Sequence, residues 1–276
     1  MTTNVNSGKM RNLLKKKLFL FDIDGTIAVG DTLYAGSREL LDHIAAIGGK
    51  AYYITNNSTR SGADYVKKFR DAFGLETTED QFVTSGYMTI RFLKENYTGK
   101  KIFVLGTASF VEELRRNGLC VTEICEKGIA CVLVAYDSEL NYKKLIQISH
   151  VLLTMDVPFY ATNPDLRCPT DFGFIPDCGA ICDMVTATTD KVPIYLGKPN
   201  KEMVIRCLEL SKFTPEETLV VGDRLYTDIA CGINGGVDTC VVFTGEAKPS
   251  DLVNTSYQPT YAFTSIAELY RACCAR

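Results

Sequence analysis

The 276-residue sequence is poor in the side chains on which several enzyme classes depend. It contains two histidines, His43 and His150, and no tryptophan. A Ser-His-Asp hydrolase or a zinc site with several histidines would have to use this pair, which disfavours both classes. The 11 cysteines include no Cys-x-x-Cys pair. Cys178 and Cys182, four residues apart, come nearest to one, and we expect them to be small buried apolar side chains.

The sequence also lacks a strong charge excess and a long apolar run. Its 30 basic residues stand against 33 acidic ones, for a net charge of −3, which argues against nucleic-acid binding through a broad basic surface. Residues 1–16 are polar and then basic, without a secretory signal, and predict a flexible tail. The apolar run at 18–21 is far too short to span a membrane. We therefore expect a cytoplasmic protein with reduced thiols and neither a nucleic-acid nor a membrane partner.

What is present is an alternation of short apolar segments with amphipathic ones, which is typical of an α/β fold with a parallel sheet covered by helices. Residues 18–21 predict a strand buried on both faces, because all four are apolar. Further strands are predicted at 51–54, 102–105, 130–134, 159–160, 194–196, 219–221 and 240–243. Helices are predicted at 37–47, 61–73, 110–117, 142–155, 202–210 and 266–274.

The first predicted strand is followed directly by Asp22-Ile23-Asp24-Gly25-Thr26. Two carboxylates at a strand exit are poor core residues, because burying unpaired charge costs several kcal/mol or more. The carboxyl edge of an open α/β sheet is where such folds bind ligands. A simple Asp-Gly turn is the alternative, and it explains the second carboxylate less well.

Polar residues follow three other predicted strands. Thr55-Asn56-Asn57-Ser58 brings a hydroxyl and amides to the start of a helix, which suits an anion, although a plain helix cap would use the same residues. Gly197-Lys198-Pro199 supplies one ammonium group, and a solvated loop lysine is its alternative. Gly222-Asp223-Arg224-Leu225-Tyr226-Thr227-Asp228 supplies two more carboxylates.

This set of groups fits phosphoryl transfer to an aspartate. Asp22 and Asp223, with the backbone carbonyl of Asp24, can hold Mg²⁺, which prefers oxygen ligands. Lys198 adds a second positive charge, and Thr55 with nearby amides can bind phosphoryl oxygens. Asp22 would attack phosphorus, and Asp24 would protonate the leaving oxygen and later accept a proton from water.

Taken together, Asp22-x-Asp24-Gly25-Thr26, Thr55-Asn56-Asn57, Gly197-Lys198-Pro199 and Gly222-Asp223 with Thr227-Asp228 resemble the four motifs of haloacid dehalogenase-type (HAD) phosphatases, in their usual order. The resemblance implies a Rossmann-like core, Asp22 as nucleophile and Asp24 as acid and base. It also implies phosphate binding by Thr55 and Lys198, which we extend to Asn56 and Asn57. Asp223 is implied as a Mg²⁺ ligand, and Asp228 as a support for the metal site or Lys198. The second aspartate favours a phosphatase over a dehalogenase.

The long interval between Thr55 and Lys198 predicts an inserted α/β domain at 87–188, within a core of 1–86 and 189–276. An insertion after the second motif resembles the type-2 cap of these phosphatases. The match extends to the NagD-like, p-nitrophenylphosphatase-like branch through four further stretches: Thr55-Asn56-Asn57-Ser58, Val134-Ala135-Tyr136-Asp137, Ala161-Thr162-Asn163-Pro164-Asp165 and Gly173-Phe174-Ile175-Pro176.

Within this resemblance, Asn163 and Asp165 lie on a cap loop that faces the active site, where we expect them to bind the substrate, although Asn-Pro-Asp is also a common turn. The branch implies small phosphate monoesters as substrates, including nucleoside monophosphates, phosphoglycolate, pyridoxal phosphate and sugar phosphates. It also implies a homodimer formed through the cap. A catalytically weak binding or regulatory protein on the same fold is the main alternative, against which the complete set of acidic residues and Lys198 counts. A nucleotide-sugar transferase with an Asp-x-Asp motif is contradicted by Lys198 and the second acidic motif.

Overall fold

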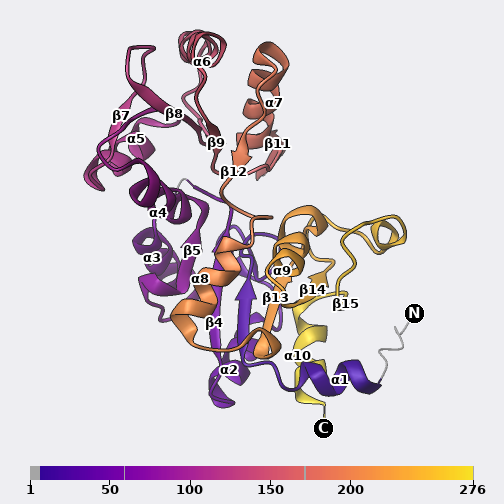
Figure 1. Ribbon diagram of the computed structural model, residues 1–276. Helices are drawn as coiled ribbons and strands as arrows, with labels where there is room; N and C mark the ends of the chain where they lie inside the picture. Colours follow the sequence, from indigo (N-terminus) through magenta and orange to yellow (C-terminus); the bar gives the residue numbers. More distant parts are fainter. Residues whose placement is uncertain (1–6, 59, 171, 276) are drawn as a thin grey trace. The chain divides into compact units, whose positions relative to one another are not determined.

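Two parallel β-sheets, one in each of two units, form the framework of the chain (Figure 1). This computed structural model describes residues 7–58, 60–170 and 172–275. Helices cover the sheets, so the predicted α/β class is confirmed. Unit 1 consists of Met1–Thr55, Gly62–Val83 and Pro199–Arg276, and unit 2 consists of Asn56–Ser61 and Thr84–Lys198.

The sheet of unit 1 has the strand order β15-β14-β13-β1-β4-β5. β1 is central and pairs in parallel with β4 and with β13. All four of its residues are buried, because helices cover both faces of the sheet and no side chain points to water. The strands are β1 (Leu18–Phe21), β4 (Lys50–Thr55), β5 (Phe82–Thr84), β13 (Thr218–Gly222), β14 (Asp238–Val242) and β15 (Tyr261–Phe263).

Successive side chains of β1 face opposite sides of the sheet, and each side has its own helices. Phe19 and Phe21 join the core formed with α2 and α10, which contains Leu40 and Leu269. α8 contacts β1 and β4, and α9 lies on the face of Val220, which a Cβ at Gly232 would approach to 3.1 Å. The helices of unit 1 are α1 (Ser7–Leu13), α2 (Ser37–Ala46), α3 (Gly62–Phe73), α8 (Glu202–Ser211), α9 (Ala230–Asn234) and α10 (Ile266–Cys274).

The N-terminal segment differs from the predicted flexible tail over its second half. Residues 1–6 lie outside the described residues, but α1 follows them directly. Leu13 is 1% exposed within the core of unit 1. Lys16 is equally buried, and its ammonium lies 2.7 Å from a carboxylate oxygen of Asp238. Apolar packing, hydrogen bonds and an ion pair therefore hold a segment whose composition is that of a tail.

The sheet of unit 2 has the order β12-β9-β8-β6-β7. α6 and α7 pack on the side of Val132 and Val134, and α4 and α5 pack on the side of Cys131 and Leu133. A separate antiparallel hairpin joins β10 to β11. The elements are α4 (Ser85–Tyr97), β6 (Lys101–Leu105), α5 (Ala108–Arg116), β7 (Cys120–Thr122), β8 (Ile129–Val134), α6 (Tyr142–Thr154), β9 (Phe159–Ala161), β10 (Arg167–Thr170), β11 (Gly173–Pro176), α7 (Cys178–Thr189) and β12 (Ile194–Tyr195).

The sequence predicts an inserted domain at 87–188, whereas the contacts within the chain assign Thr84–Lys198 to unit 2. Unit 2 runs to Lys198 because β12, at residues 194–195, pairs with β9 of the same unit. It also contains Asn56–Ser61, which precedes α3. Lys198, which the sequence assigns to the core domain, therefore belongs to unit 2 by its contacts.

The cysteines behave as small apolar side chains. Cys178 and Cys182, both on α7, are fully buried in the core of unit 2, as expected. All 11 cysteines are free thiols.

Among the residues that the structure describes, none of the helices combines the length and the apolar character that crossing a bilayer requires.

Candidate active site

The register of the unit 1 sheet places Asp22 beside the start of the last acidic motif. Phe21 is aligned with Val221 on one side and with Tyr53 on the other. The backbone N–H of Asp22 donates to Val221 O at 2.9 Å, which continues the ladder by one residue. Asp22 is 9% exposed and Asp223 is 2% exposed. Parallel pairing thus brings two carboxylates to one edge of the sheet, although about two hundred residues separate them in sequence.

The turn after Asp22 depends on a glycine and a threonine. Gly25 has φ +91°, a conformation that L side chains rarely adopt, and a Cβ there would lie 2.8 Å from Asp223 Oδ2. Thr26 is fully buried, and its hydroxyl lies 3.4 Å from Asp22 Oδ2 and 3.2 Å from Asp223 Oδ1. The hydroxyl therefore lies between the two carboxylates and helps to orient both.

Asp223 is further fixed by the segment that follows β14. The backbone N–H of Glu246 donates to Asp223 Oδ2 at 2.8 Å, and that of Ala247 donates to its carbonyl oxygen at 2.9 Å. A Cβ at Gly245 would lie 2.0 Å from Asp223 Oδ2, so no other residue permits this approach. Thr244 closes the arrangement, because its hydroxyl donates to the carbonyl oxygen of Gly25 at 2.6 Å.

Asp228 reaches the same place from a π-helical turn, η3 (Leu225–Ile229). Such turns are rare and occur often at functional sites. The backbone N–H of Arg224 donates to Asp228 Oδ2 at 3.0 Å. A Cβ at Gly222 would lie 2.1 Å from the Cβ of Asp228, so the glycine lets this side chain pass over the end of β13.

These three aspartates form a cluster that could hold a metal ion. One carboxylate oxygen from each of Asp22, Asp223 and Asp228 lies within 4.8 Å of the others, the one such group found among the described residues. Opposite ligands of an octahedral Mg²⁺ lie about 4.2 Å apart, so the spread requires only a small side-chain adjustment. Three buried carboxylates repel one another, and a hard divalent cation relieves that repulsion. The donor set therefore fits Mg²⁺.

Compared with the predicted ligands Asp22, Asp24 and Asp223, the structure adds the carboxylate of Asp228 to the cluster and leaves that of Asp24 outside it. The Asp24 carboxylate is 39% exposed, and its Oδ1 lies 3.9 Å from the ammonium of Lys68 on α3. Its predicted metal contact uses the backbone carbonyl and stays a prediction. Burial raises the pKa of the Tyr34 phenol, and the negative charges of the nearby Asp223 and Asp24 carboxylates raise it further.

In unit 2 the structure brings together four other predicted site residues. They are Asn56, Asn163, Asp165 and Lys198. The Asn56 side-chain amide bonds to the backbone of Lys198 and to the carboxylate of Asp165. All four are buried, none being more than 8% exposed. The side chains of Asn56, Asn163 and Asp165 therefore form a hydrogen-bonded group with the backbone of Lys198 within this unit.

The remaining two predicted site residues lie at the end of β4. Thr55 is the last residue of that strand and is 4% exposed. Asn57, two residues further on, is half-buried. The strand end therefore carries a hydroxyl and amides in succession, as the sequence predicts.

Sequence reasoning assigned no role to Thr26, to the segment 244–247 or to Lys68. The segment could have been found, because Thr244-Gly245-Glu246 follows a predicted strand just as the four motifs do. Thr26 stands inside the first motif, where its hydroxyl was a signal for hydrogen bonding to the neighbouring carboxylates. Lys68 gives no such signal, because a lysine within a helix is ordinarily solvated.

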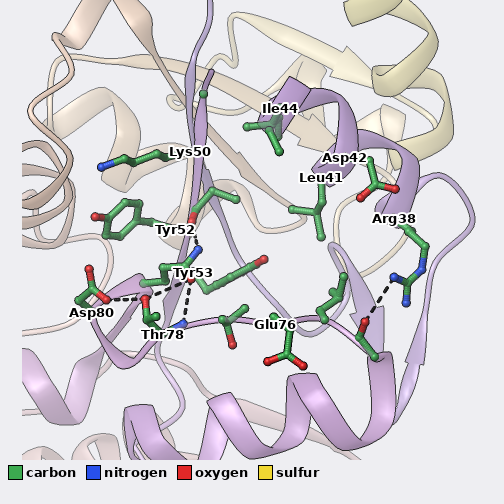
Figure 2. Close-up of a pocket in the computed structure, with 17 residues that line it drawn as sticks. Arg38, Leu41, Asp42, Ile44, Lys50, Tyr52, Tyr53, Glu76, Thr78 and Asp80 are labelled. Atoms are coloured by element: carbon green, nitrogen blue, oxygen red, sulfur yellow. Dashed lines mark hydrogen bonds between the residues drawn. The ribbon is translucent and has the colours of Figure 1, made fainter. Parts of the chain in front are cut away.

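A cavity of about 550 Å³ in unit 1 is separate from these residues (Figure 2). It lies between α2, β4 and the segment 74–81, and its lining includes Arg38, Lys50, Tyr52 and Asp80. None of the predicted site residues lines it. A second cavity, of about 540 Å³, is lined by Arg224, which follows Asp223, and by Glu246 and Ala247, whose N–H groups bond to Asp223.

Known proteins are similar to this chain over most of its length. The model of the haloacid dehalogenase-like hydrolases matches residues 19–120, and that of the HAD-hydrolase-like family matches residues 195–269. An acid sugar phosphatase of Staphylococcus aureus (strain MRSA252) is 31% identical over 252 residues, which are 91% of this chain and 96% of the relative.

Two solved structures are similar over nearly their whole length. The 4-nitrophenylphosphatase of Thermotoga maritima has a TM-score of 0.87 and 33% identity, with 95% of this chain and 99% of that chain covered. NagD from E. coli K-12 has a TM-score of 0.80 and 29% identity, with 92% and 98% covered. The first family match contains Asp22, Asp24 and Thr55, and the second contains Lys198, Asp223 and Asp228.

Proposed function

The chain belongs to the haloacid dehalogenase-like hydrolases, in the phosphatase branch that includes NagD, and we propose that it hydrolyses small phosphate monoesters with the help of Mg²⁺. One observation above all supports this proposal. The carboxylates of Asp22, Asp223 and Asp228 converge at one edge of the unit 1 sheet, and Asp24 follows Asp22 by two residues. A nucleophile, a set of metal ligands and an acid are thereby supplied by the segments that follow β1 and β13.

In the proposed reaction, a carboxylate oxygen of Asp22 forms a bond to phosphorus while the bond from phosphorus to the ester oxygen breaks. Asp24 donates its proton to the departing oxygen, which leaves as an alcohol. Water then attacks the aspartyl-phosphate, Asp24 accepts a proton from this water, and inorganic phosphate leaves. The exposure of Asp24 suits this role, because the group must exchange protons with leaving group and water in turn.

The proposed Mg²⁺ would be held by Asp22 and Asp223, with the backbone carbonyl of Asp24 and the carboxylate of Asp228 as further oxygen donors. When bound, it would offset the negative charge that otherwise keeps a carboxylate from a phosphate dianion. Thr26 keeps Asp22 oriented through its hydroxyl. Lys198 would supply a second positive charge, and Thr55 and Asn57 would bind phosphoryl oxygens.

For the substrate class, we propose the small monoesters that the resemblance implies, which are sugar phosphates, nucleoside monophosphates, phosphoglycolate and pyridoxal phosphate. Sugar phosphates are supported by the name of the Staphylococcus relative, an acid sugar phosphatase. An aryl phosphate is supported by the name of the Thermotoga structure.

The test is release of inorganic phosphate from a panel of these monoesters and p-nitrophenyl phosphate, with Mg²⁺ or with EDTA. We expect release by the wild type with Mg²⁺, its loss in EDTA, and its restoration when Mg²⁺ is added in excess. Asp22→Asn removes the nucleophile and should lower kcat by about 10⁴-fold or more, because no covalent intermediate can form.

Asp31→Asn is the matched control, because Asp31 is an exposed carboxylate in the turn between β2 (Ala28–Val29) and β3 (Thr32–Leu33). It should keep the wild-type rate. If wild type and Asp22→Asn were equally inert toward the whole panel, the hydrolytic proposal would fail and a binding protein on this fold would be favoured.

A further inference from the structure

A hydrogen-bond network in unit 2 joins three segments that are far apart in sequence. Two are the segments at the ends of the insertion, 56–61 and 197–198, and the third is the loop at 162–165 after β9. Its side chains are buried, and buried polar groups are retained where each is hydrogen-bonded. The partners of each group therefore indicate what the network fixes.

The Asn56 side chain pairs with both backbone groups of Lys198. Its Oδ1 accepts from the Lys198 N–H at 2.8 Å, and its Nδ2 donates to the Lys198 carbonyl oxygen at 3.0 Å. The amide thus acts on Lys198 as the backbone of a neighbouring strand would. The backbone of Asn56 is itself anchored, because its carbonyl oxygen accepts from the hydroxyl of Ser85 at 2.7 Å.

Asp165 determines which way the Asn56 amide points. Nδ2 of Asn56 has two hydrogens, and besides the Lys198 carbonyl it donates to Asp165 Oδ2 at 2.7 Å. If the amide were flipped, its oxygen would face the carboxylate and its NH₂ would face the Lys198 N–H, so both contacts would be repulsive. Asn163 donates to the same oxygen of Asp165 at 2.9 Å. The carboxylate therefore selects the one amide orientation that matches the backbone of Lys198.

Gly197 makes room for this pairing. A Cβ at this position would lie 2.6 Å from Asn56 Oδ1 and 2.5 Å from the carbonyl oxygen of Thr162. The N–H of Gly197 donates to that same Thr162 oxygen at 2.8 Å. The glycine of the Gly-Lys-Pro motif is thus required by contacts with both of the other segments.

We infer that Asn56 and Asp165 are positioning residues that fix the backbone of Lys198, and that they act through Lys198 instead of binding the substrate. The inference rests on the proposed function, in which the Lys198 ammonium meets the phosphoryl group. A lysine side chain is long and flexible, so its reach is set by the placement of its backbone. Misplacing a reacting group by about 1 Å can cost about 100-fold in rate.

Asp165→Leu tests the inference by removing the acceptor while keeping a side chain of similar size. We expect kcat to fall about 100-fold, by the same factor for every active panel member, while KM changes less than about threefold. Asp165→Asn should recover most of the rate, because one amide oxygen can accept both bonds that Asp165 Oδ2 accepts. A direct contact with the leaving group would instead raise KM by a factor that differs between substrates, and this result would overturn the inference.

A double-substitution cycle separates positioning from an independent contribution. In the Lys198→Ala background, Asp165→Leu should cause no further loss of kcat, because the side chain that it positions is gone. Losses that multiply would overturn the inference. Asp137→Asn is the matched control, since Asp137 is a fully buried carboxylate of the same unit that pairs with Lys144 at 2.7 Å. It should lower Tm and leave kcat per folded molecule unchanged.

Hydrogen exchange supplies a readout that needs no catalysis. The N–H of Lys198 is protected by Asn56 Oδ1, so a peptide covering residues 196–200 should exchange faster in folded Asp165→Leu and near the wild-type rate in Asp165→Asn. If exchange in folded Asp165→Leu were unchanged, the positioning role would be overturned. If exchange rose while the wild type hydrolysed no panel member, the fixing of Lys198 would stand and the proposed function alone would fail.

Discussion

At the scale of single residues, glycines decide whether the carboxylates can meet. We expect Gly25→Ala to weaken Mg²⁺ binding by about 10- to 100-fold, the usual cost of disturbing the groups that orient metal ligands. The new Cβ would lie 2.8 Å from Asp223 Oδ2, so that carboxylate must move. The Mg²⁺ concentration that gives half-maximal phosphate release measures the effect.

Gly30→Ala separates backbone strain from this steric effect. Gly30 also has a positive φ, +54°, but nothing lies within 4 Å of the position of its Cβ. Its substitution should cost about 1 kcal/mol of stability and leave the Mg²⁺ requirement unchanged. An equal shift of the Mg²⁺ requirement in both variants would show that the backbone turn, and not the contact with Asp223, matters.

The candidate site shows what residue patterns can predict. Asp22 and Asp223 were predictable because buried strands precede them and carboxylates are unsuited to a core. The burial of Asp165 was not, because Asn-Pro-Asp reads equally as a turn that faces the substrate. Its position depends on the amides of Asn56 and Asn163, and the pairing with Asn56 crosses more than one hundred residues of sequence. Such contacts leave no local periodicity in the sequence.

At the scale of elements, the attachment of α1 depends on a buried ion pair. Lys16 is 1% exposed, and its ammonium bonds to Asp238 at 2.7 Å and to the carbonyl oxygen of Glu216 at 2.6 Å. We expect Lys16→Ala to lower the free energy of unfolding by about 2–4 kcal/mol, because both oxygens lose the ammonium, although Asp238 Oδ2 keeps its hydrogen bond from Asn12 Nδ2. Urea unfolding measures the change.

Lys17→Ala is the natural comparison, since Lys17 is 48% exposed and its ammonium lies 3.7 Å from Glu217. This exposed pair should contribute less than about 1 kcal/mol. If the two variants unfolded at the same urea concentration, the burial of Lys16 would carry no extra stability.

The elements that the sequence predicted share one property, which is a strong local pattern. The helix predicted at 266–274 has the bounds of α10, and the strand predicted at 18–21 has those of β1. The helices α1, α4, α7 and α9 were missed. The first residues of α7 are Cys178-Gly179-Ala180, which local propensity does not mark as helical. Its packing against α6 and β8 within unit 2 stabilises it nonetheless.

At the scale of the whole molecule, burial protects most thiols. Burial raises the pKa of Cys131 to about 12 and that of Cys273 to about 12, so both stay neutral at pH 8. Of the 11 cysteines, only Cys120 and Cys274 are exposed. We expect a thiol-specific disulfide reagent at pH 8 to label these two rapidly, and all 11 to react in denaturant, because the thiolate is the reactive form.

The raised pKa values of these thiols also predict how the stability of the folded chain changes with pH. Because the folded chain holds these thiols neutral, their contribution to stability is present below the pKa of the unfolded thiol, near 9, and is lost as pH rises toward 12. Labelling of the buried thiols should therefore accelerate above pH 9. Rapid reaction of all 11 at pH 8 without denaturant would contradict the packing around them.

The strands of the unit 1 sheet lie on both sides of the insertion in sequence, and this affects how the chain folds during its synthesis. β1 pairs with β4, which precedes the insertion, and with β13, which follows it. During synthesis on the ribosome, β1 therefore has one open edge until residue 222 has emerged, whereas the sheet of unit 2 is complete at residue 195. An apolar strand with an unpaired edge is prone to pair with other chains. The nascent protein should thus be most dependent on chaperones while its inserted unit is being translated.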